Sequence, residues 1–238
     1  MGAIHRWADL TGPELADVAA GDPVAVWPLA AVEQHGAHLP LGTDTIIGEG
    51  LLAAACGTLR ETPLPDARDL LILPTLAPAA SLEHSAYPGT LSLASEQVIA
   101  TLESVGADLA RAGIRRLVLF NSHGGNKAVM DLAALKLRAA HAMLVVKASY
   151  FRFAPAAEAL PAAELAHGVH GGALETALMA HLAPERIRTA HVADARPLGR
   201  ELADAERGAA LCAHIAERTA AVLRDAAAFD LSRLRSMP

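Results

Sequence analysis

The apolar run Val24-Ala25-Val26-Trp27-Pro28-Leu29 decides the fold, because a short continuous hydrophobic stretch predicts a buried strand. Three similar runs follow along the chain, at residues 70–73, 117–120 and 144–146. Segments with a helical pattern separate or follow these runs, at residues 45–59, 95–112, 127–141, 172–183 and 200–227. Strands that alternate with helices are typical of a mainly parallel sheet covered on both faces. The sequence therefore predicts an α/β fold in a single domain, residues 1–238.

Composition and charge exclude several classes of protein. The chain has 238 residues and a formal charge of −6 with no basic stretch, which argues against nucleic acid or an anionic membrane surface as partner. No apolar run approaches the roughly 20 residues that a membrane helix needs. The first residues, Met1 to Leu10, carry charges and lack the apolar core of a signal peptide. We therefore expect a cytoplasmic protein that binds neither nucleic acid nor membrane.

Glycine-flanked turns directly after two of the predicted strands contain side chains that bind metals. Glu33-Gln34-His35-Gly36 follows the first strand, and Asn121-Ser122-His123-Gly124-Gly125-Asn126 follows the third. In open α/β sheets, ligands bind beyond the carboxyl ends of the strands. Carboxylate plus imidazole is a ligand set for Zn²⁺, Mn²⁺ or Fe²⁺. The pattern indicates a metal-dependent hydrolase.

Three of the residues in these motifs have a second interpretation or a purely structural one. Asp44 lies in a turn before a helix, where Asp is a favoured N-cap, but beside Glu33 and His35 a carboxylate that bridges two cations is the better interpretation. The sequence His123-Gly124-Gly125 could form an oxyanion hole or a phosphate loop. No Gly-x-Ser-x-Gly or Gly-x-x-x-x-Gly-Lys motif accompanies it, so metal ligation is favoured. Glu175 would lie in the first turn of a helix, where a carboxylate also compensates the helix dipole.

Two further stretches supply candidates for proton transfer and substrate contact. His170 lies on the glycine-rich approach to the helix at 172–183 and is a candidate proton shuttle, with His167 nearby as a second candidate. The loop at residues 81–90 is polar and rich in turn residues, and such loops often line pockets. Within it, Glu83 and His84 are candidates for substrate contact, and a purely structural loop is the alternative.

Together these motifs resemble the creatininase family, the creatinine amidohydrolases and their relatives. Five blocks occur in the family's order over about residues 24–180, and together they are highly specific. They are Glu33-Gln34-His35-Gly36-x-His38-Leu39-Pro40, Gly42-Thr43-Asp44, Ser81-Leu82-Glu83-His84 through Pro88-Gly89-Thr90-Leu91-Ser92, Asn121-Ser122-His123-Gly124-Gly125-Asn126, and His170-Gly171-Gly172-x-x-Glu175-Thr176. The resemblance implies a three-layer α/β/α fold, two divalent metal ions per chain (Zn²⁺ or Mn²⁺, alternatively Fe²⁺) and a homo-oligomer, often a hexamer.

The resemblance also implies roles for single residues. Glu33 and His123 resemble ligands of one metal. His35 resembles a ligand of the other, and Asp44 resembles the bridge between them. Creatininase has a glutamate ligand at the position where this chain has Gly125. Some relatives also have glycine in this block, and the resemblance to them implies that Glu175 takes over as the ligand. Candidates for catalysis are then His170 and Glu175, and those for substrate binding are Ser81, Glu83, His84, Gly124 and His167.

Departures from the family pattern bear on the substrate. Creatininase has an aromatic residue after the histidine of the fourth block, where this chain has Gly124. It also has a tryptophan and an aspartate shortly before the equivalent of His170, where Ala166 and His167 stand. Contacts that would hold creatinine are largely missing. We therefore expect an amidohydrolase that hydrolyses a non-peptide C–N bond of another small (cyclic) amide, through a water activated by two metal ions.

Two other functions are compatible with the same sequence. A deformylase or peptidase of this family would share the metal site and differ in the size of its pocket. A catalytically inactive binding or assembly protein with the same fold would be expected to have lost a ligand, whereas all five candidate ligands are present.

Overall fold

The central sheet has five strands. The computed structural model describes residues 2–153, 170–194 and 204–234. Within these ranges the strands lie in the order β1-β3-β2-β4-β5, and every pairing is parallel. The strands are β1 (Ile4–Arg6), β2 (Val24–Leu29), β3 (Leu70–Ile72), β4 (Arg116–Asn121) and β5 (Leu144–Ser149). All positions of β2 and β4 are buried, as expected for parallel strands covered on both faces.

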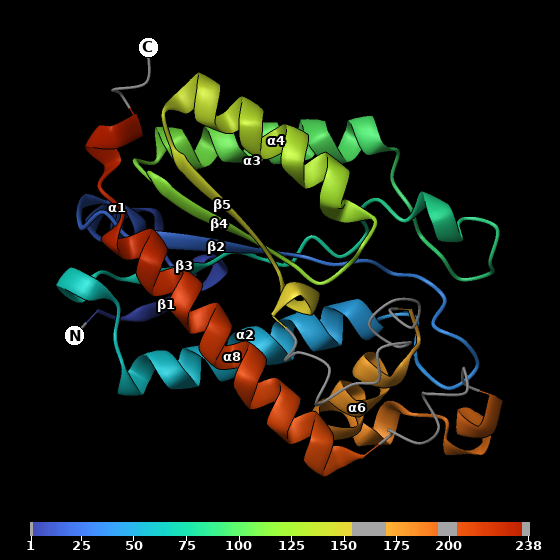
Figure 1. The fold of residues 1–238 in the computed structure, drawn as a ribbon. Coiled ribbons are helices and arrows are strands. Elements are labelled where there is room, and N and C mark those ends of the chain that lie inside the picture. The colour runs from blue at the N-terminus through green and yellow to red at the C-terminus, as the bar shows by residue number, and fades with distance from the viewer. Residues whose placement is uncertain (1, 154–169, 195–203, 235–238) are drawn as a thin grey trace.

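Helices cover both faces of this sheet (Figure 1). One face packs against α2 (Thr43–Glu61), α6 (Ala173–Leu182) and α8 (Ala205–Ala228). The other packs against α3 (Ser95–Arg111) and α4 (Asn126–His141), with α1 (Gly12–Ala20) at its margin. Alternate residues of β2 supply the two cores, because successive side chains of a strand point to opposite faces. The predicted three-layer α/β/α fold with a parallel sheet is confirmed.

Two elements at the amino end of the chain were not predicted. β1 is an edge strand of three residues with only partial burial, too short to show a periodic pattern. α1 begins after Thr11, whose backbone N–H and hydroxyl both donate to the Glu14 carboxylate at 2.7 Å. The predicted helix at residues 95–112 is α3 and begins at Ser95, and the N–H of Ala94 before it donates to the Gln97 side chain.

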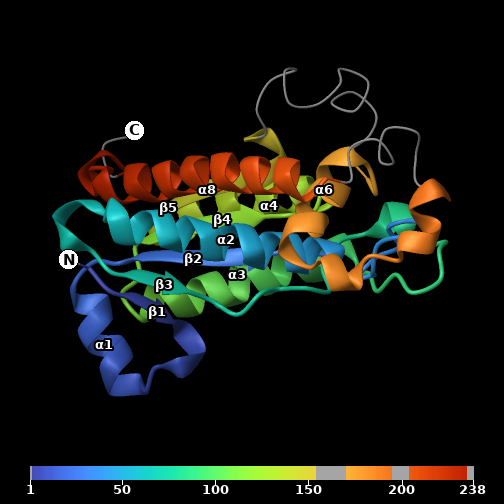
Figure 2. The ribbon, with the colours of Figure 1, turned by 90° about the horizontal axis from the view of Figure 1, so that it is seen from below.

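The apolar face of α8 packs within the chain. The sequence left open whether this helix covers its own sheet or forms an interface between subunits. Its buried residues, among them Leu211, Ile215 and Leu223, share one core with α2 and α6. Figure 2 shows α8 and α2 side by side over the same face. In the ranges that the structure describes, no helix is both long enough and apolar enough to span a membrane.

The strand order creates a crevice between the ends of β2 and β4. From β2 the chain passes to β3 on one side and then returns to β4 on the other side. The helices that follow β2 and β4, α2 and α4, lie on opposite faces of the sheet. In open α/β sheets, such a reversal separates the loops beyond the carboxyl ends and leaves room for a ligand. The motif loops after β2 and β4 therefore meet at this point.

Candidate metal centre

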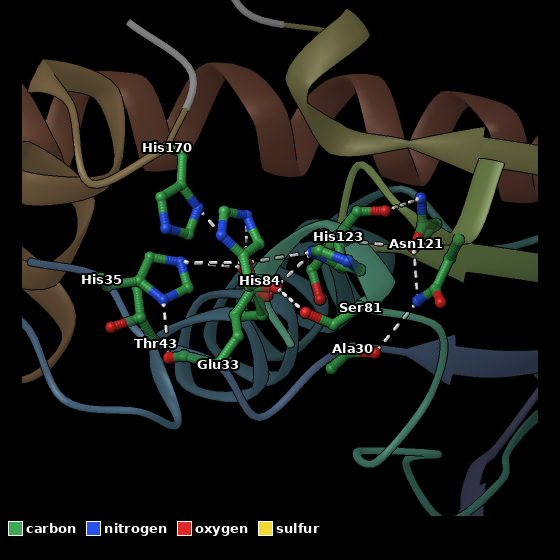
Figure 3. A network of polar contacts seen from close by, with 12 residues as sticks. Ala30, Glu33, His35, Thr43, Ser81, His84, Asn121, His123 and His170 are labelled. Atoms are coloured by element: carbon green, nitrogen blue, oxygen red, sulfur yellow. Dashed lines mark hydrogen bonds and ion pairs between the residues drawn. The ribbon is translucent and has the colours of Figure 1, made fainter. Parts of the chain in front are cut away.

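Histidines and carboxylates from all five sequence motifs meet at the carboxyl ends of β2 and β4. Figure 3 shows four imidazoles gathered around Glu33. Its Oε1 atom lies 3.2 Å from Nδ1 of His170 and 3.3 Å from Nδ1 of His123. The same oxygen lies 3.8 Å from Nε2 of His35 and 3.8 Å from Nε2 of His84. Since Glu33 is fully buried, these imidazoles define its surroundings.

Asp44 presents its two oxygens to two different histidines. Oδ1 lies 3.4 Å from Nε2 of His35, and Oδ2 lies 3.3 Å from Nδ1 of His123. A carboxylate placed in this way can bridge two cations about 3.5–4 Å apart. Gly42 occupies the N-cap position of α2, and Asp44 lies inside the first turn. The alternative role of Asp44 as a helix N-cap therefore does not match the structure.

Glu175 approaches the same ring nitrogen of His35 as Asp44 does. Its Oε2 atom is 3.6 Å from Nε2 of His35 and accepts a hydrogen bond of 2.7 Å from the N–H of Gly171. The residue is in the first turn of α6 and is 5% exposed. Ligand atoms of His35, Asp44 and Glu175 all lie within 4.8 Å of one another. Glu175 can therefore act as a metal ligand while it also accepts a hydrogen bond from the backbone that precedes its helix.

Backbone carbonyl groups determine which nitrogen of each histidine faces the centre. Nδ1 of His35 lies 3.1 Å from the carbonyl oxygen of Glu33, and Nε2 of His123 lies 3.0 Å from that of Ala80. Because a carbonyl oxygen only accepts, these two nitrogens donate. The other two nitrogens, Nε2 of His35 and Nδ1 of His123, then face the carboxylates and would offer their lone pairs to a bound cation. Histidines that bind metals are usually oriented by such a second hydrogen bond.

Three buried atoms of this cluster fit the requirements of bound cations. Within the part of the chain that the structure describes, Glu33 Oε1, His35 Nε2 and Asp44 Oδ2 have no hydrogen-bond partner. An unsatisfied buried polar atom costs about 1–3 kcal/mol, and more when it is charged. Divalent cations would satisfy all three atoms at once. Carboxylate oxygens and imidazole nitrogens are the ligands that Zn²⁺ and Mn²⁺ accept, so the residues present fit such ions.

The carboxylates also raise the pKa values of the two buried histidines. Burial alone would lower the pKa of His35, but the charges of Glu175 and Asp44 outweigh it and raise this pKa. For His123, burial again lowers the pKa, but the nearby carboxylates of Asp44 and Glu33 outweigh it and raise this pKa. Protons on these rings balance the carboxylates when no cation is bound. A cation would take their place, since metal ligands must be deprotonated.

Gln34, which the sequence did not mark as functional, orients His170. The N–H of Gly36 donates to Oε1 of Gln34 at 3.0 Å, which fixes the orientation of the amide. The Gln34 amide nitrogen then lies 3.0 Å from Nε2 of His170 and 3.4 Å from Nδ1 of His84. Because this amide nitrogen only donates, Nε2 of His170 accepts, and Nδ1 carries its proton toward Glu33. The His170 ring also stacks on that of His84, with 4.0 Å between centroids.

The candidates for substrate contact occupy different positions. A cavity of about 460 Å³ opens at the centre, and Glu83, His84 and Gly124 are among its lining residues. Ser81 is fully buried behind this lining, and its hydroxyl donates to Oε2 of Glu33. This position differs from the expected one, because Ser81 orients Glu33 and does not face the cavity. His167 lies outside the described residues.

The two glycines after His123 have different surroundings. A Cβ at Gly124 would meet no atom within 4 Å, whereas one at Gly125 would clash with Glu83, His123 and the Ala80 backbone. The absence of a side chain at Gly125 lets the Glu83 carboxylate approach Nε2 of His123 to 3.3 Å. Position 125 therefore cannot supply a ligand here, and the space is used by Glu83.

Two further residues of the site were not identified from the sequence. Tyr150 follows β5, is 1% exposed and lines the cavity. Burial and the neighbouring Glu175 raise its pKa, so it remains a neutral phenol. Asn126 donates to the carbonyl of Ala30 at 3.0 Å and accepts from the N–H of Ala80 at 3.1 Å, which joins three motif loops. Tyr150 could have been found by the rule that located His123, since both follow the carboxyl end of a strand.

Comparisons with known proteins identify relatives of this chain. A family model described as creatinine amidohydrolase (Creatininase) matches residues 8–204. The mycofactocin precursor peptide peptidase of Mycobacterium tuberculosis is 34% identical over 168 residues, 70% of this chain and 61% of that protein. This chain therefore matches less than two thirds of that relative's length. The creatinine amidohydrolase of Pseudomonas putida is 34% identical over 198 residues, 76% of this chain and 73% of that protein.

Solved structures of creatininases have the same fold. A crystal structure of creatinine amidohydrolase (creatininase) superposes with a TM-score of 0.79 at 26% identity, over 94% of this chain and 98% of that one. A structure described as creatininase Mn gives a TM-score of 0.74 at 26% identity, over 92% and 97% of the two chains. The family model and these relatives together show that the chain belongs to the creatininase family.

Proposed function

We propose that this chain is a metal-dependent amidohydrolase that hydrolyses a C–N bond with water activated between two divalent cations. One observation carries the proposal: Asp44 directs one oxygen to His35 and the other to His123. Buried atoms without partners in the described ranges, on Glu33, His35 and Asp44, support it. Membership of the creatininase family supports a hydrolase rather than a non-catalytic protein.

In this proposal, Glu33 and His123 would hold one cation, and His35 and Glu175 would hold the other. Asp44 would supply one oxygen to each. Bound in this way, the cations would lower the pKa of a shared water from about 15.7 toward 7 and polarise the substrate carbonyl. Zn²⁺ and Mn²⁺ are the proposed ions, with Fe²⁺ as an alternative, and a similar structure described as creatininase Mn supports Mn²⁺.

His170 is the proposed group that protonates the leaving nitrogen. Its Nδ1 atom is 3.2 Å from Glu33 at the centre, and its side chain is 23% exposed and lines the cavity. A proton donor needs both properties, because it must reach the reacting bond and exchange protons with water. Gln34 keeps the donor nitrogen directed at the centre through its contact with Nε2.

The bond that is cleaved distinguishes the two leading candidates. The first is a non-peptide C–N bond of a small (cyclic) amide. The second is a peptide or formamide bond, and the relatives named mycofactocin precursor peptide peptidase support the peptidase form. A cavity of about 460 Å³ has room for a short peptide segment as well as for a small ring.

Metal content and a matched substrate panel test this proposal. Protein prepared without chelator and then repleted with Zn²⁺ or Mn²⁺ should retain about two ions per chain by elemental analysis. The repleted protein should hydrolyse at least one class among cyclic amides, N-formyl compounds and short peptides, and chelation should abolish this activity. Negligible metal after repletion would contradict the proposal and favour a binding or assembly protein.

Three further expectations remain predictions. The family resemblance suggests a homo-oligomer, such as a hexamer, which light scattering of the purified protein would measure directly. A cytoplasmic location and a single folding domain are proposed from the sequence alone. Differential scanning calorimetry with one cooperative transition would support the single domain.

A further inference from the structure

Two basic side chains line the cavity, and the proposed reaction gives neither of them a role. Lys127 lies in the first turn of α4, and Arg152 ends the short helix Tyr150–Arg152 after β5. β4 and β5 pair in parallel along their whole length. Because α4 follows β4 and the short helix follows β5, both cations stand at the same edge of the sheet. They therefore face one cavity from two neighbouring connections.

Neither cation is neutralised by a neighbour that the structure describes. Lys136 and Lys147 each form an ion pair, with Glu103 and Asp131 respectively. No ion pair or hydrogen bond of the Lys127 or Arg152 side chain occurs among residues 2–153, 170–194 and 204–234. Both residues are exposed, so their charges can be reached by a ligand that enters the cavity.

The position of Lys127 in its helix points to an anion. The first turn of α4 contains Lys127 and no acidic residue. The amino end of a helix carries a partial positive charge, which favours anions and disfavours a lysine. Lys127 and the helix terminus would therefore act together on an anionic group that lies between them and Arg152.

The charge inside the cavity leads to the same conclusion. Four carboxylates line it, those of Glu33, Asp44, Glu83 and Glu175. Two divalent cations would balance these four charges, and histidine ligands are neutral when metal is bound. The charges of Lys127 and Arg152 would remain, so the loaded cavity would attract negatively charged groups.

We propose that Lys127 and Arg152 bind an anionic group of the substrate, a carboxylate or a phosphate, while the amide to be cleaved lies at the metal centre. The preferred substrates are then amides that carry such a group, and a neutral ring amide would leave both side chains unused. A guanidinium binds either anion through two parallel hydrogen bonds, and an ammonium adds a point charge. This inference rests on the proposed function for the position of the amide and for the two cations that balance the carboxylates of the cavity.

Binding of matched probes to the metal-loaded protein tests the inference without turnover. One pair is N-acetylglycine and its neutral amide, and the other is N-acetylethanolamine with and without a phosphate on its hydroxyl. We expect calorimetry to show that the wild type binds an anionic member at least about tenfold tighter than its neutral partner. The pair with the larger preference identifies carboxylate or phosphate as the recognised group.

Substitutions then locate the preference. Lys127→Gln and Arg152→Gln should each reduce it, and the double variant should abolish it while the affinity for neutral probes is unchanged. Lys136→Gln, an ion-paired lysine on the same helix, is the matched control and should keep the full preference. A preference that persists in the double variant would show that the anion binds the metal ions directly, and it would overturn the inference.

Hydrolysis of the same probes separates this inference from the proposed function. Where the wild type hydrolyses the anionic probe, Lys127→Gln should raise KM for it and leave kcat nearly unchanged, because the contact is equal in ground and transition states. Selective binding without hydrolysis of any probe would count against the proposed function but support the anion site. Equal binding and equal hydrolysis of charged and neutral probes would refute the anion site alone.

Discussion

Arg116 and Glu33 are buried at opposite ends of the sheet and differ in how their own polar atoms are paired. At the amino end of β4, Arg116 is 4% exposed, yet all three of its nitrogens find acceptors. NH1 donates to the carbonyls of Ala226 and Phe229 at 2.8 and 2.7 Å, and Nε and NH2 donate to Asp22 at 3.1 and 3.0 Å. At the carboxyl end of β2, Glu33 and other buried groups keep atoms without a partner in the described ranges.

The difference between these two residues indicates that Arg116 is structural and Glu33 is functional. Buried polar groups in folded proteins are nearly always hydrogen-bonded, so exceptions need an explanation. Arg116 joins the end of α8 to β4 with groups of the chain alone. The cluster around Glu33 gathers negative charges that repel one another unless something positive is added. Local departures from good packing and pairing are expected at functional sites.

Asp44→Ala should have the largest effect, because it removes the carboxylate that faces both histidines. We expect loss of both metal ions and of all measurable hydrolysis, since neither ion keeps a complete ligand set. Elemental analysis and the substrate panel would measure the two losses. Glu61→Gln, which removes an exposed carboxylate at the far end of the same helix, is the control and should retain metal. A fully active Asp44→Ala protein would contradict the interpretation of the cluster at the carboxyl end of β2 as the functional one.

His170→Ala should rank second, because it removes the proposed proton donor and leaves the ligands in place. The expected loss in kcat is roughly 10²–10⁴-fold, the usual range for a general acid–base group. Metal content should stay at the wild-type value. Ligand atoms of Glu33, His35 and His170 also lie within 4.8 Å of one another, so a variant that loses metal would identify His170 as a ligand instead.

Most of the layers could be predicted from the sequence because their signals are local. Continuous apolar runs marked β2, β3, β4 and β5, and a run buried on both faces can lie only between two layers of helices. β1 was missed because its three residues form an edge strand with little burial. α8 begins at Ala205, because Asp204 has an extended backbone and caps the helix by accepting from the N–H of Glu206, so the predicted beginning at residue 200 is wrong.

The candidate site was less predictable, because its contacts join residues far apart in the sequence. Glu33, His35, Asp44 and His123 could be proposed from residue type and from the loops after strands. The role of Ser81 could not, since only the folded chain shows its hydroxyl behind Glu33. Gln34 was missed for a related reason: its partners His84 and His170 lie 50 and 136 residues away.

Ser81→Ala tests the polar cluster at the carboxyl end of β2, because it removes the buried hydroxyl that donates to Glu33. Without this hydroxyl, Oε2 of Glu33 loses a hydrogen bond, and the carboxylate is less firmly oriented. We expect the affinity for metal to fall about 10- to 100-fold, as for other groups that orient metal ligands. Competition with a chelator of known affinity would measure this change. Ser85→Ala, in the same loop but exposed, should leave metal affinity unaltered.

Arg116→Gln should have the smallest effect at the centre, although it acts on the fold. The variant loses charged hydrogen bonds to Asp22 and to the end of α8, and Asp22 is 35% exposed, so water replaces part of what is lost. We expect the free energy of unfolding to fall by about 1.5–3 kcal/mol. Urea denaturation would measure this change, with Arg111→Gln, an exposed arginine on α3, as the control.

Metal content per folded Arg116→Gln chain decides whether the two ends are independent. Arg116 and Asn121 stand at opposite ends of β4, and only the latter borders the motif loops. If the amino end serves folding alone, folded variant protein should bind metal and substrate as the wild type does. A weaker metal affinity in the folded variant would mean that β4 transmits a shift from one end to the other. The cluster around Glu33 would then depend on the whole strand and not only on the loops that carry its ligands.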